Sequence, residues 1–384
     1  MLGINSNINS LVAQQNLNGS QNALSQAITR LSSGKRINSA ADDAAGLAIS
    51  TRMQTQINGL NQGVSNANDG VSMIQTASSA LSSLTNSLQR IRQLAVQAST
   101  GTMSTTDQAA LQQEVAQQIQ EVNRISSQTT YNGTNILDGS AGIVSFQVGA
   151  NVGQTISLDL SQSMSAAKIG GGLVQKGQTV GTVTGLSLTN AGAYTGSGAA
   201  ITAINVISDG QGGYTFTDQN GQGITSGAAT AVFGSNATAG TGTAVGALSL
   251  QSGATGAGTT AAQLTAINNA IAQINAVNTP KTVSNLDIST VSGANVAMVS
   301  IDNALQTVNN VQAALGAAQN RFTAIATAQQ AESTDLSSAQ SQITDANFAQ
   351  ETANMSKNQV LQQAGISVLA QANSLPQQVL KLLQ

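Results

Sequence analysis

The sequence contains no histidine, no cysteine and no tryptophan, and its aromatic residues, five Phe and three Tyr, make up 2% of the 384 residues. Without histidine or cysteine, the chain cannot build a Ser-His-Asp triad, a cysteine nucleophile or an ordinary zinc site. The acidic residues are scattered, and the adjacent pair Asp42 and Asp43 precedes a run of small residues, where carboxylates commonly cap a helix. We therefore predict no catalytic residue, no metal site and no cofactor.

Charge is also scarce, at 8% of residues with a net charge of −3. Binding to nucleic acid needs several clustered cations, and the pair Lys35 and Arg36 is too small a patch. The chain has no run of 18 apolar residues, and its first basic residue is Arg30. We therefore expect neither a membrane span nor a secretory signal at the amino end, so that export would use another route.

Both ends of the chain carry apolar residues at helical spacing. A stripe between residues 57 and 98 advances in steps of three or four, which places it on one face of one helix. At about 1.5 Å per residue this helix is roughly 60 Å long, and its single narrow seam needs partner helices of similar length. The stripe consists of Ile57, Leu60, Val64, Ala67, Val71, Ile74, Ala77, Leu81, Leu84, Leu88, Ile91, Ala95 and Ala98.

Two further segments are predicted to supply the partner helices. A third helix is expected to start at Thr106 and Asp107, which can cap it, and to continue to Ile125. The carboxyl-terminal stripe should pair antiparallel with the first across the intervening chain. It consists of Met298, Ile301, Leu305, Val308, Val311, Leu315, Ala318, Phe322 and Ile325, followed by Leu336, Ala339, Ile343 and Ala346.

The extreme ends carry thinner stripes in segments rich in Asn, Gln, Ser and Ala. Isolated amphipathic helices are marginal in water, so we expect both ends to be mobile until they assemble. The amino-terminal stripe consists of Ile4, Ile8, Leu11, Leu17, Leu24, Ile28 and Leu31. The carboxyl-terminal stripe consists of Leu361, Ala364, Val368, Ala372, Leu375, Val379 and Leu382.

The middle of the chain changes to strand-like patterns. Residues 143–148 and 155–160 are extended runs joined by a Gly-Ala-Asn-Val-Gly turn, which predicts a β-hairpin. Residues 177–280 are Gly-rich and have no Lys or Arg, and we interpret them as a small, mostly β domain with a helix near its end; disorder is the alternative. Asp218 and Asn220 resemble the start of a calcium loop, but Ala229 stands where a bidentate Glu is required, so we favour a hairpin turn.

The segment "LQRIRQLAVQ" (88–97) presents polar residues away from the predicted core. At about 100° per residue, Arg90 and Gln97 point nearly opposite to Leu88 and Ile91, and Leu94 lies about a quarter turn off the core. An outward Arg beside a partly exposed Leu is either a solvated surface or an interface. Striped helical ends around a Gly-rich, nearly uncharged middle indicate a fibre-forming subunit, so we favour the interface.

Four segments carry a resemblance to a known family: "MLGINSNINSLVAQQNLN" at the start, "LSSGKRINSAADDAAGLAIS" (31–50), "LGAAQNRF" (315–322) and "LQQAGISVLAQANSLPQQVLKLLQ" (361–384). Together they closely resemble bacterial flagellin over about the first 175 and the last 100 residues. We see no resemblance for residues 177–280.

The resemblance implies a structural subunit of the extracellular flagellar filament, which serves swimming motility. Such a subunit is exported unfolded by the flagellar type III apparatus, without a cleaved signal peptide, and forms a helical homopolymer under a cap protein. The hook-filament junction protein, a partner in the flagellum, is the alternative identity. An insert that binds a ligand such as a glycan is a further hypothesis, and a metallopeptidase insert is excluded because its H-E-x-x-H motif needs histidine.

The resemblance also implies roles for particular residues. Recognition by a host Toll-like receptor, together with subunit contact, falls on Gln89, Arg90, Leu94 and Glu114. Self-assembly falls on the terminal helices, with Ile4, Ile8, Leu11, Leu24, Ile28, Leu31, Leu361, Val368 and Leu375. Binding of the export chaperone and of cytosolic innate sensors falls on Val379, Leu380, Leu382 and Leu383.

The predicted fold is mainly α, a long antiparallel coiled-coil-like rod built from both chain ends, with a β-hairpin and a small, mostly β outer insert. We expect residues 1–45 and 350–384 to form the inner filament layers. Residues 46–176 and 285–349 should form the rod, and residues 177–284 the variable outer domain.

Overall fold

A computed structural model describes residues 7–195, 198–234, 247–251 and 260–382. Its contacts divide the chain into two units, and each unit combines segments that are far apart in sequence. The terminal unit consists of Met1–Asn68, Gln147–Thr155 and Thr323–Gln384. The central unit consists of Asp69–Phe146 and Ile156–Phe322.

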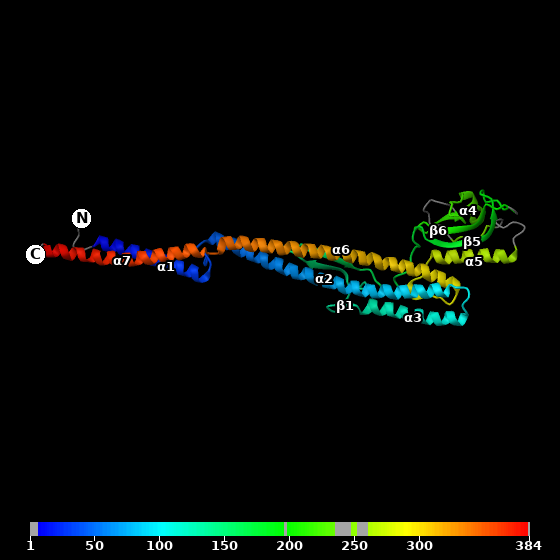
Figure 1. The fold of residues 1–384 in the computed structure, drawn as a ribbon, viewed down its shortest axis with the longest axis horizontal. Helices are drawn as coiled ribbons and strands as arrows, with labels where there is room; N and C mark the ends of the chain where they lie inside the picture. The colour runs from blue at the N-terminus through cyan, green and yellow to red at the C-terminus, as the bar shows by residue number, and fades with distance from the viewer. Residues whose placement is uncertain (1–6, 196–197, 235–246, 252–259, 383–384) are drawn as a thin grey trace. The chain divides into compact units, whose positions relative to one another are not determined.

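Four long helices come from the two ends of the chain: α1 (Ile8–Ser33), α2 (Ala44–Ala98), α6 (Val291–Thr344) and α7 (Phe348–Leu382). Helices α2 and α6 contribute to both units, and within each unit their segments run side by side (Figure 1). In the terminal unit Ser333 donates a hydrogen bond of 2.9 Å to Asn61, and in the central unit Arg92 forms an ion pair of 2.6 Å with Asp302. The predicted antiparallel helical rod is confirmed.

Side-chain caps define two helix starts. Asp43 accepts a hydrogen bond of 2.8 Å from the backbone N–H of Gly46, which confirms the predicted cap at the start of α2. Helix α3 (Thr105–Gln128) begins earlier than expected, because Ser104 is its cap and exchanges hydrogen bonds with Asp107 in a capping box. Asp107 therefore lies in the first turn of α3, and its side chain completes the cap from there.

The predicted stripes form the helical core. Between Ile74 and Ala98 every member of the first stripe is buried, and Val64 and Val71 are half-buried. In α6, Ile301, Val308, Leu315 and Phe322 are buried while the intervening members are half-buried. The Phe322 ring fills the space left by Gly70, where an added Cβ would come within 2.7 Å of the ring, and it packs edge-on against Phe146 with ring centroids 5.2 Å apart.

Leu94 is fully buried, with 1% of its surface exposed, so the prediction of a partly exposed outward leucine is wrong. The reason is that α2 has two partners in the central unit. Helix α3 packs against the last turns of α2, where Gln108 donates to the carbonyl of Ala98 and Glu114 pairs with Arg90. A residue a quarter turn away from the α6 side therefore still lies in an apolar environment.

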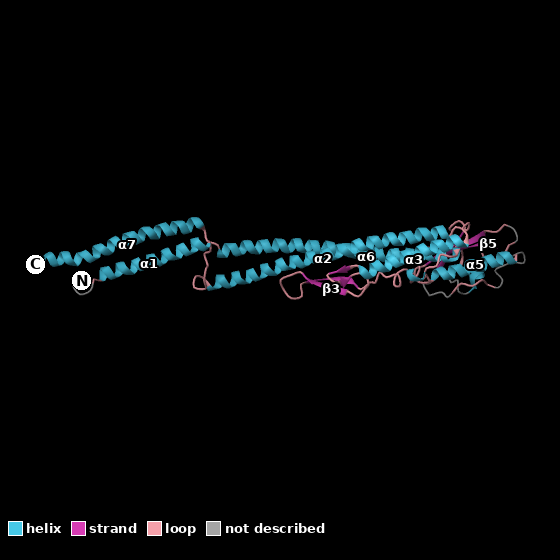
Figure 2. Ribbon diagram, turned by 90° about the horizontal axis from the view of Figure 1, so that it is seen from below, coloured by secondary structure: helices cyan, strands magenta, loops and turns pink. Residues whose placement is uncertain are grey.

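Two hairpins follow α3. Strands β1 (Thr130–Tyr131) and β2 (Thr134–Asn135) form a minimal pair. Strands β3 (Gly142–Gln147) and β4 (Thr155–Leu160) form the predicted larger hairpin, drawn in magenta in Figure 2. In β4 every second side chain is buried, namely Ile156, Leu158 and Leu160. The predicted period of two is therefore confirmed.

The insert is a small α+β domain. Strands β5 (Thr179–Leu188), β6 (Ile201–Ser208) and β7 (Tyr214–Asp218) form an antiparallel sheet, with Val183 opposite Ile204 and Val206 opposite Phe216. The expected helix is α5 (Ala261–Asn278), and Ile267, Ile271 and Ile274 lie in the core of the insert. Helix α4 (Ser226–Phe233) was not predicted, and it places Phe233 against Phe216 with ring centroids 5.2 Å apart.

Close packing of α2 in the terminal unit predicts a stability effect at Gly63. A Cβ added there would lie 2.1 Å from the carbonyl oxygen of Val148, so Gly63→Ala should lower the free energy of unfolding by about 1–3 kcal/mol. The matched control is Gly316→Ala in α6, where the Cβ meets no atom within 4 Å and the better helix former should stabilise by about 0.5–1 kcal/mol. Thermal unfolding followed by circular dichroism measures both, and equal changes would contradict the close approach.

The burial of Leu94 predicts a second stability effect. Leu94→Ala should lower the free energy of unfolding by about 2–5 kcal/mol, because it leaves a cavity among α2 and its partner helices. Val96→Ala, two residues away at a position with 45% exposure, should change it by less than about 0.5 kcal/mol. Chemical denaturation of the two variants makes the comparison, and similar small losses would mean that Leu94 faces solvent.

Candidate assembly surfaces

Helices α1 and α7 lie side by side in the terminal unit (Figure 1). They run antiparallel, since Asn7 at the cap of α1 donates a hydrogen bond of 2.7 Å to the carbonyl of Ala372 near the other end of the chain. The buried and half-buried residues of each helix recur in alternating steps of three and four. In α1 they include Ser10, Ala13, Leu17, Ser20, Leu24, Ala27 and Leu31, and in α7 they are chiefly Glu351, Met355, Asn358, Gln362, Gly365, Leu369 and Ala372.

We call these buried and half-buried residues between α1 and α7 the seam. Some of the predicted self-assembly residues lie in the seam, and others lie on the exposed sides of the two helices. Leu24 and Leu31 are half-buried in the seam. Ile4 and Leu383 lie outside the described residues, and for Leu375, Val379, Leu380 and Leu382 only the helical backbone is described. The predicted residues that remain exposed are Ile8, Leu11, Ile28, Leu361 and Val368.

Large apolar residues other than the predicted ones are also exposed on the same two helices. Val12 on α1 and Phe348, Val360 and Ile366 on α7 are exposed as well. We call the exposed set Ile8, Leu11, Val12, Ile28, Phe348, Val360, Leu361, Ile366 and Val368 the terminal apolar surface. Nine large apolar side chains exposed on two adjacent helices make this set a candidate interaction site.

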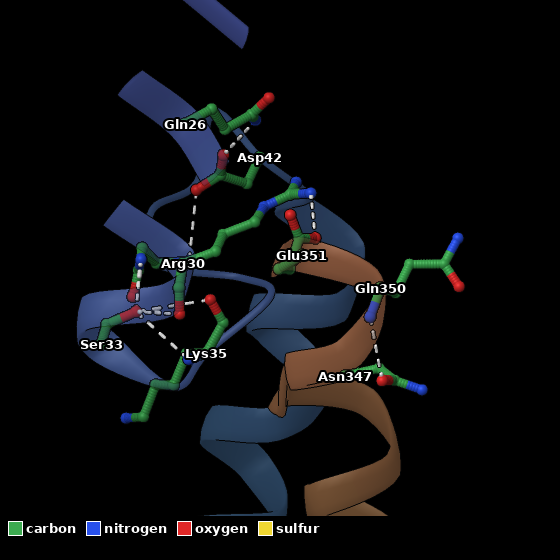
Figure 3. Close-up of polar contacts among 9 residues, drawn as sticks. Gln26, Arg30, Ser33, Lys35, Asp42, Asn347, Gln350 and Glu351 are labelled. Carbon is green, nitrogen blue, oxygen red and sulfur yellow. Dashed lines mark hydrogen bonds and ion pairs between the residues drawn. The ribbon is translucent and has the colours of Figure 1, made fainter. Parts of the chain in front are cut away.

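Polar contacts hold the loop between α1 and α2 against the carboxyl-terminal end of α1 (Figure 3). Asp42 accepts hydrogen bonds from the backbone N–H groups of Asn38 and Ser39, from the Ser39 hydroxyl and from Gln26 of α1. These bonds, those from Ser39 foremost, lower the pKa of the Asp42 carboxyl. The loop is thus folded on itself and tied to α1 by a charged acceptor.

The loop also pairs with the short link between α6 and α7. Arg36 donates from its backbone N–H to the carbonyl of Thr344 at 2.6 Å, and Ala346 donates to the carbonyl of Gly34 at 2.9 Å. On α7, the side chain of Asn347 accepts a bond of 3.3 Å from the backbone N–H of Gln350. One turn into α7, Arg30 of α1 forms an ion pair of 3.3 Å with Glu351 (Figure 3).

A second candidate surface lies in the central unit, where α2 meets α3. The Arg90 guanidinium pairs with the Glu114 carboxylate at 2.6 Å, and the two side chains remain 49% and 38% exposed. Gln89 is exposed beside Arg90 on α2. The structure thus brings Gln89, Arg90 and Glu114 to an outer face, whereas Leu94 lies beneath it.

A groove between β4 and α6 in the central unit combines apolar and charged lining residues. It has a volume of about 560 Å³. Its lining includes the apolar residues Val311, Ala314 and Leu315 and the charged residues Asp159 and Arg321. Within the described ranges, no three acidic side chains cluster in a way that could hold a metal ion. The same ranges contain no helix that is both long enough and apolar enough to cross a membrane.

Comparison with known proteins agrees with this architecture. Family profiles match in three consecutive segments: "Bacterial flagellin N-terminal helical region" over residues 4–142, "Flagellin, D2 domain" over residues 172–277 and "Bacterial flagellin C-terminal helical region" over residues 298–383. The second match extends the likeness to the insert, for which the sequence analysis found no resemblance.

Individual relatives with similar sequences are also flagellins. The chain is 55% identical over 169 residues to the B-type flagellin of Pseudomonas aeruginosa, covering 44% of this chain and 34% of the relative. It is 46% identical over 208 residues to the flagellin of Escherichia coli K12, covering 54% of this chain and 41% of the relative. The matched parts thus span about a third to two fifths of these curated relatives.

A solved structure matches over its whole length. FliC from Burkholderia pseudomallei is 66% identical, with a TM-score of 0.61, and the match covers 66% of this chain and 100% of the solved one. Both the paired helical ends and the sequence between them are therefore shared with one group of proteins. The chain belongs to the bacterial flagellin family.

Proposed function

We propose that this protein is the structural subunit that polymerises into the bacterial flagellar filament and so works outside the cell in swimming motility. The observation that carries the proposal is the terminal apolar surface, which stays exposed although α1 and α7 already cover each other's seam. Apolar side chains of this size gain roughly 1.5–3 kcal/mol each when they are fully buried. Neighbouring copies of the same helices would supply that burial.

The arrangement of the terminal unit suits such assembly. The seam of α1 and α7 is built largely from small and polar residues, such as Ala13, Ala27, Gly365 and Gln362, and contains few large apolar side chains. A thin seam leaves the pair marginal by itself. Packing between subunits would then complete the fold of the chain ends, which couples folding to polymerisation. In this proposal residues 1–45 and 350–384 form the inner layers, residues 46–176 and 285–349 the rod and residues 177–284 the outer domain.

The hook-filament junction protein of the flagellum remains the alternative. The family profiles and the relatives described above carry the name flagellin, which favours the filament subunit. Location discriminates the two: an antibody to residues 177–284 should label sheared filaments along their length. Label confined to one end would support the junction protein.

The family also suggests partners for the chain ends. We propose that the segment with Val379, Leu380, Leu382 and Leu383 binds the export chaperone, and that cytosolic innate sensors read the same segment. Export would proceed through the flagellar type III apparatus, with assembly under the cap protein. Pull-down of a purified chaperone by the full chain, but not by a chain that ends at residue 374, tests the first of these contacts.

The face formed by Gln89, Arg90 and Glu114 is proposed to contact both a neighbouring subunit and a host Toll-like receptor. The exposed, hydrogen-bonded Arg90 supports this, because arginine is enriched among the residues that dominate interfaces. Leu94 would act from below, by fixing α2 against its neighbours.

The assembly proposal predicts that the last helix is required for polymerisation. Seeded with short filament fragments, the full chain should grow long filaments in electron micrographs, whereas a chain lacking residues 350–384 should not. Equal growth by both chains would contradict assembly through the terminal helices. Growth by neither would shift support to the junction protein.

Exposed apolar residues should matter more than exposed polar ones. The double variant L361S/V368S should raise the critical concentration for polymerisation at least about tenfold, since roughly 1.4 kcal/mol of lost burial suffices for that factor. The control Q363S/Q371S changes two exposed polar residues of the same helix and should leave it nearly unchanged. Sedimentation of filaments at a series of protein concentrations measures both, and matching values would refute a role for the terminal apolar surface.

Receptor binding provides a separate test of the α2–α3 face. Arg90→Ala should weaken binding of the monomer to the receptor ectodomain by about tenfold or more, as expected for a central interface arginine. Arg124→Ala removes a similarly exposed arginine, which pairs with Glu121 on α3, and should have little effect. Surface plasmon resonance gives both affinities, and equal losses would argue against a specific site at Arg90.

A further inference from the structure

Helices α1 and α7 share a repeat that leaves their alignment ambiguous. Their seam residues alternate in steps of three and four over the whole contact, so each seam repeats every seven residues. A shift of α7 along α1 by seven residues would again place the seam residues of one helix opposite the seam residues of the other. Because many seam residues are small or uncharged, such as Ser20, Ala27, Gln362 and Gly365, apolar packing alone discriminates weakly between these alignments.

One contact differs from all others in the seam. Arg30 is the sole charged residue of α1, and Glu351 is the sole acidic residue of α7. They form an ion pair of 3.3 Å, in which the Glu351 side chain is 9% exposed and the Arg30 side chain 25% exposed. Among the described residues Arg30 Nε is buried without a hydrogen-bond partner. Forming the pair therefore removes this nitrogen from water without replacing its hydrogen bond.

Slippage would break this pair in either direction. A seven-residue shift would bring Asn358 opposite Arg30, or Ala23 opposite Glu351, and neither carries a compensating charge. A largely buried carboxylate without its cation is strongly unfavourable. A buried polar contact that specifies alignment at the expense of stability is the best-attested role of such groups in helix pairs.

We propose that the Arg30–Glu351 ion pair sets the axial alignment of α1 against α7. Its position supports this role, because Glu351 lies one turn after the link from α6 and Gln26, one turn before Arg30, is bonded to Asp42 of the loop. The pair thus acts beside the backbone pairing of the loop with the α6–α7 link, at the end where both helices enter the terminal pair. The inference rests on the proposed function in one respect: the alignment decides which residues of the terminal apolar surface stand side by side for a neighbouring subunit.

Disulfide trapping can measure the alignment, and the native chain has no cysteine to interfere. A Cβ built on Gly365 lies 3.9 Å from the Cβ of Leu17, which fits a disulfide, so L17C/G365C reports the observed alignment. L17C/A372C and L17C/N358C report the two seven-residue shifts. Each pair is oxidised mildly in seeded filaments and in the unpolymerised chain, and looped monomers are separated from cross-linked dimers by electrophoresis without reductant.

In the otherwise native chain, the L17C/G365C disulfide should dominate. Adding R30E should reduce its yield relative to the two shifted pairs by roughly tenfold, and the charge swap R30E/E351R should restore it. R124E, which reverses an exposed charge on α3, serves as the control and should leave the ratio unchanged. Restoration by the swap would distinguish alignment from a general loss of folding.

Three results would overturn the proposal: an unchanged ratio with R30E, dominance of a shifted pair in the native background, or failure of the charge swap to restore a ratio that R30E had lowered. The assembly proposal is read separately, from whether the reduced L17C/G365C chain still grows filaments on seeds. A chain that polymerises with an unchanged ratio under R30E would refute the alignment role alone. A chain that shows the native ratio but never polymerises would refute the assembly role alone.

Discussion

Burial of the α2 seam against α6 is the interaction on which the remaining structure depends. Each helix offers one narrow apolar face, and the residues that meet are separated by 210 positions for Arg92 and Asp302 and by 272 for Asn61 and Ser333. Because neither half can bury its face alone, the hairpins, α3 and the insert all extend from a frame that only the two ends together can form. Because the contacts between α2 and α6 are mostly apolar and repeat along the helices, few charged residues are needed to hold the two helices together.

The few aromatic residues lie mainly where large side chains pack between helices or against strands. Five of the eight aromatic side chains, counted from five Phe and three Tyr, take part in ring contacts: Phe146 with Phe322 in the helical core, and Tyr214 with Phe216 and Phe233 in the insert. Gly70 makes room for the first contact, so the same site combines the smallest residue with one of the largest. Elsewhere Ala and Gly permit close approach of backbones, as at Gly63.

Long periodic stripes predicted the helices of the rod and their pairing, because the burial of Ile74, Leu84 or Phe322 depends only on helical geometry and the need for a partner. The exposure of Leu94 was mispredicted, since periodicity within α2 carries no information about a second partner on its flank. The seam of α7 was hidden as well: it runs through polar and small residues such as Asn358 and Gly365, while the larger Leu361 and Val368 face outward. Helix α4 spans only eight residues and gave no periodic signal. Of the site residues, the ion pair of Arg30 with Glu351 could not be foreseen, because the alignment of two distant helices is a tertiary property.

The contacts between the two halves of the chain are nested, and this nesting implies an order of folding. The paired residues lie 210, 272, 321 and 365 positions apart on moving from Arg92–Asp302 through Asn61–Ser333 and Arg30–Glu351 to Asn7–Ala372. Closing a loop of several hundred residues at once costs roughly 5 kcal/mol of chain entropy, whereas each inner pairing that has already formed shortens the loop left to close. Folding should therefore proceed outward from the insert end, and unfolding should begin at the chain ends. Helix α1 therefore finds its partner α7 only after the inner pairs have formed, although it comes first of the described helices in the chain.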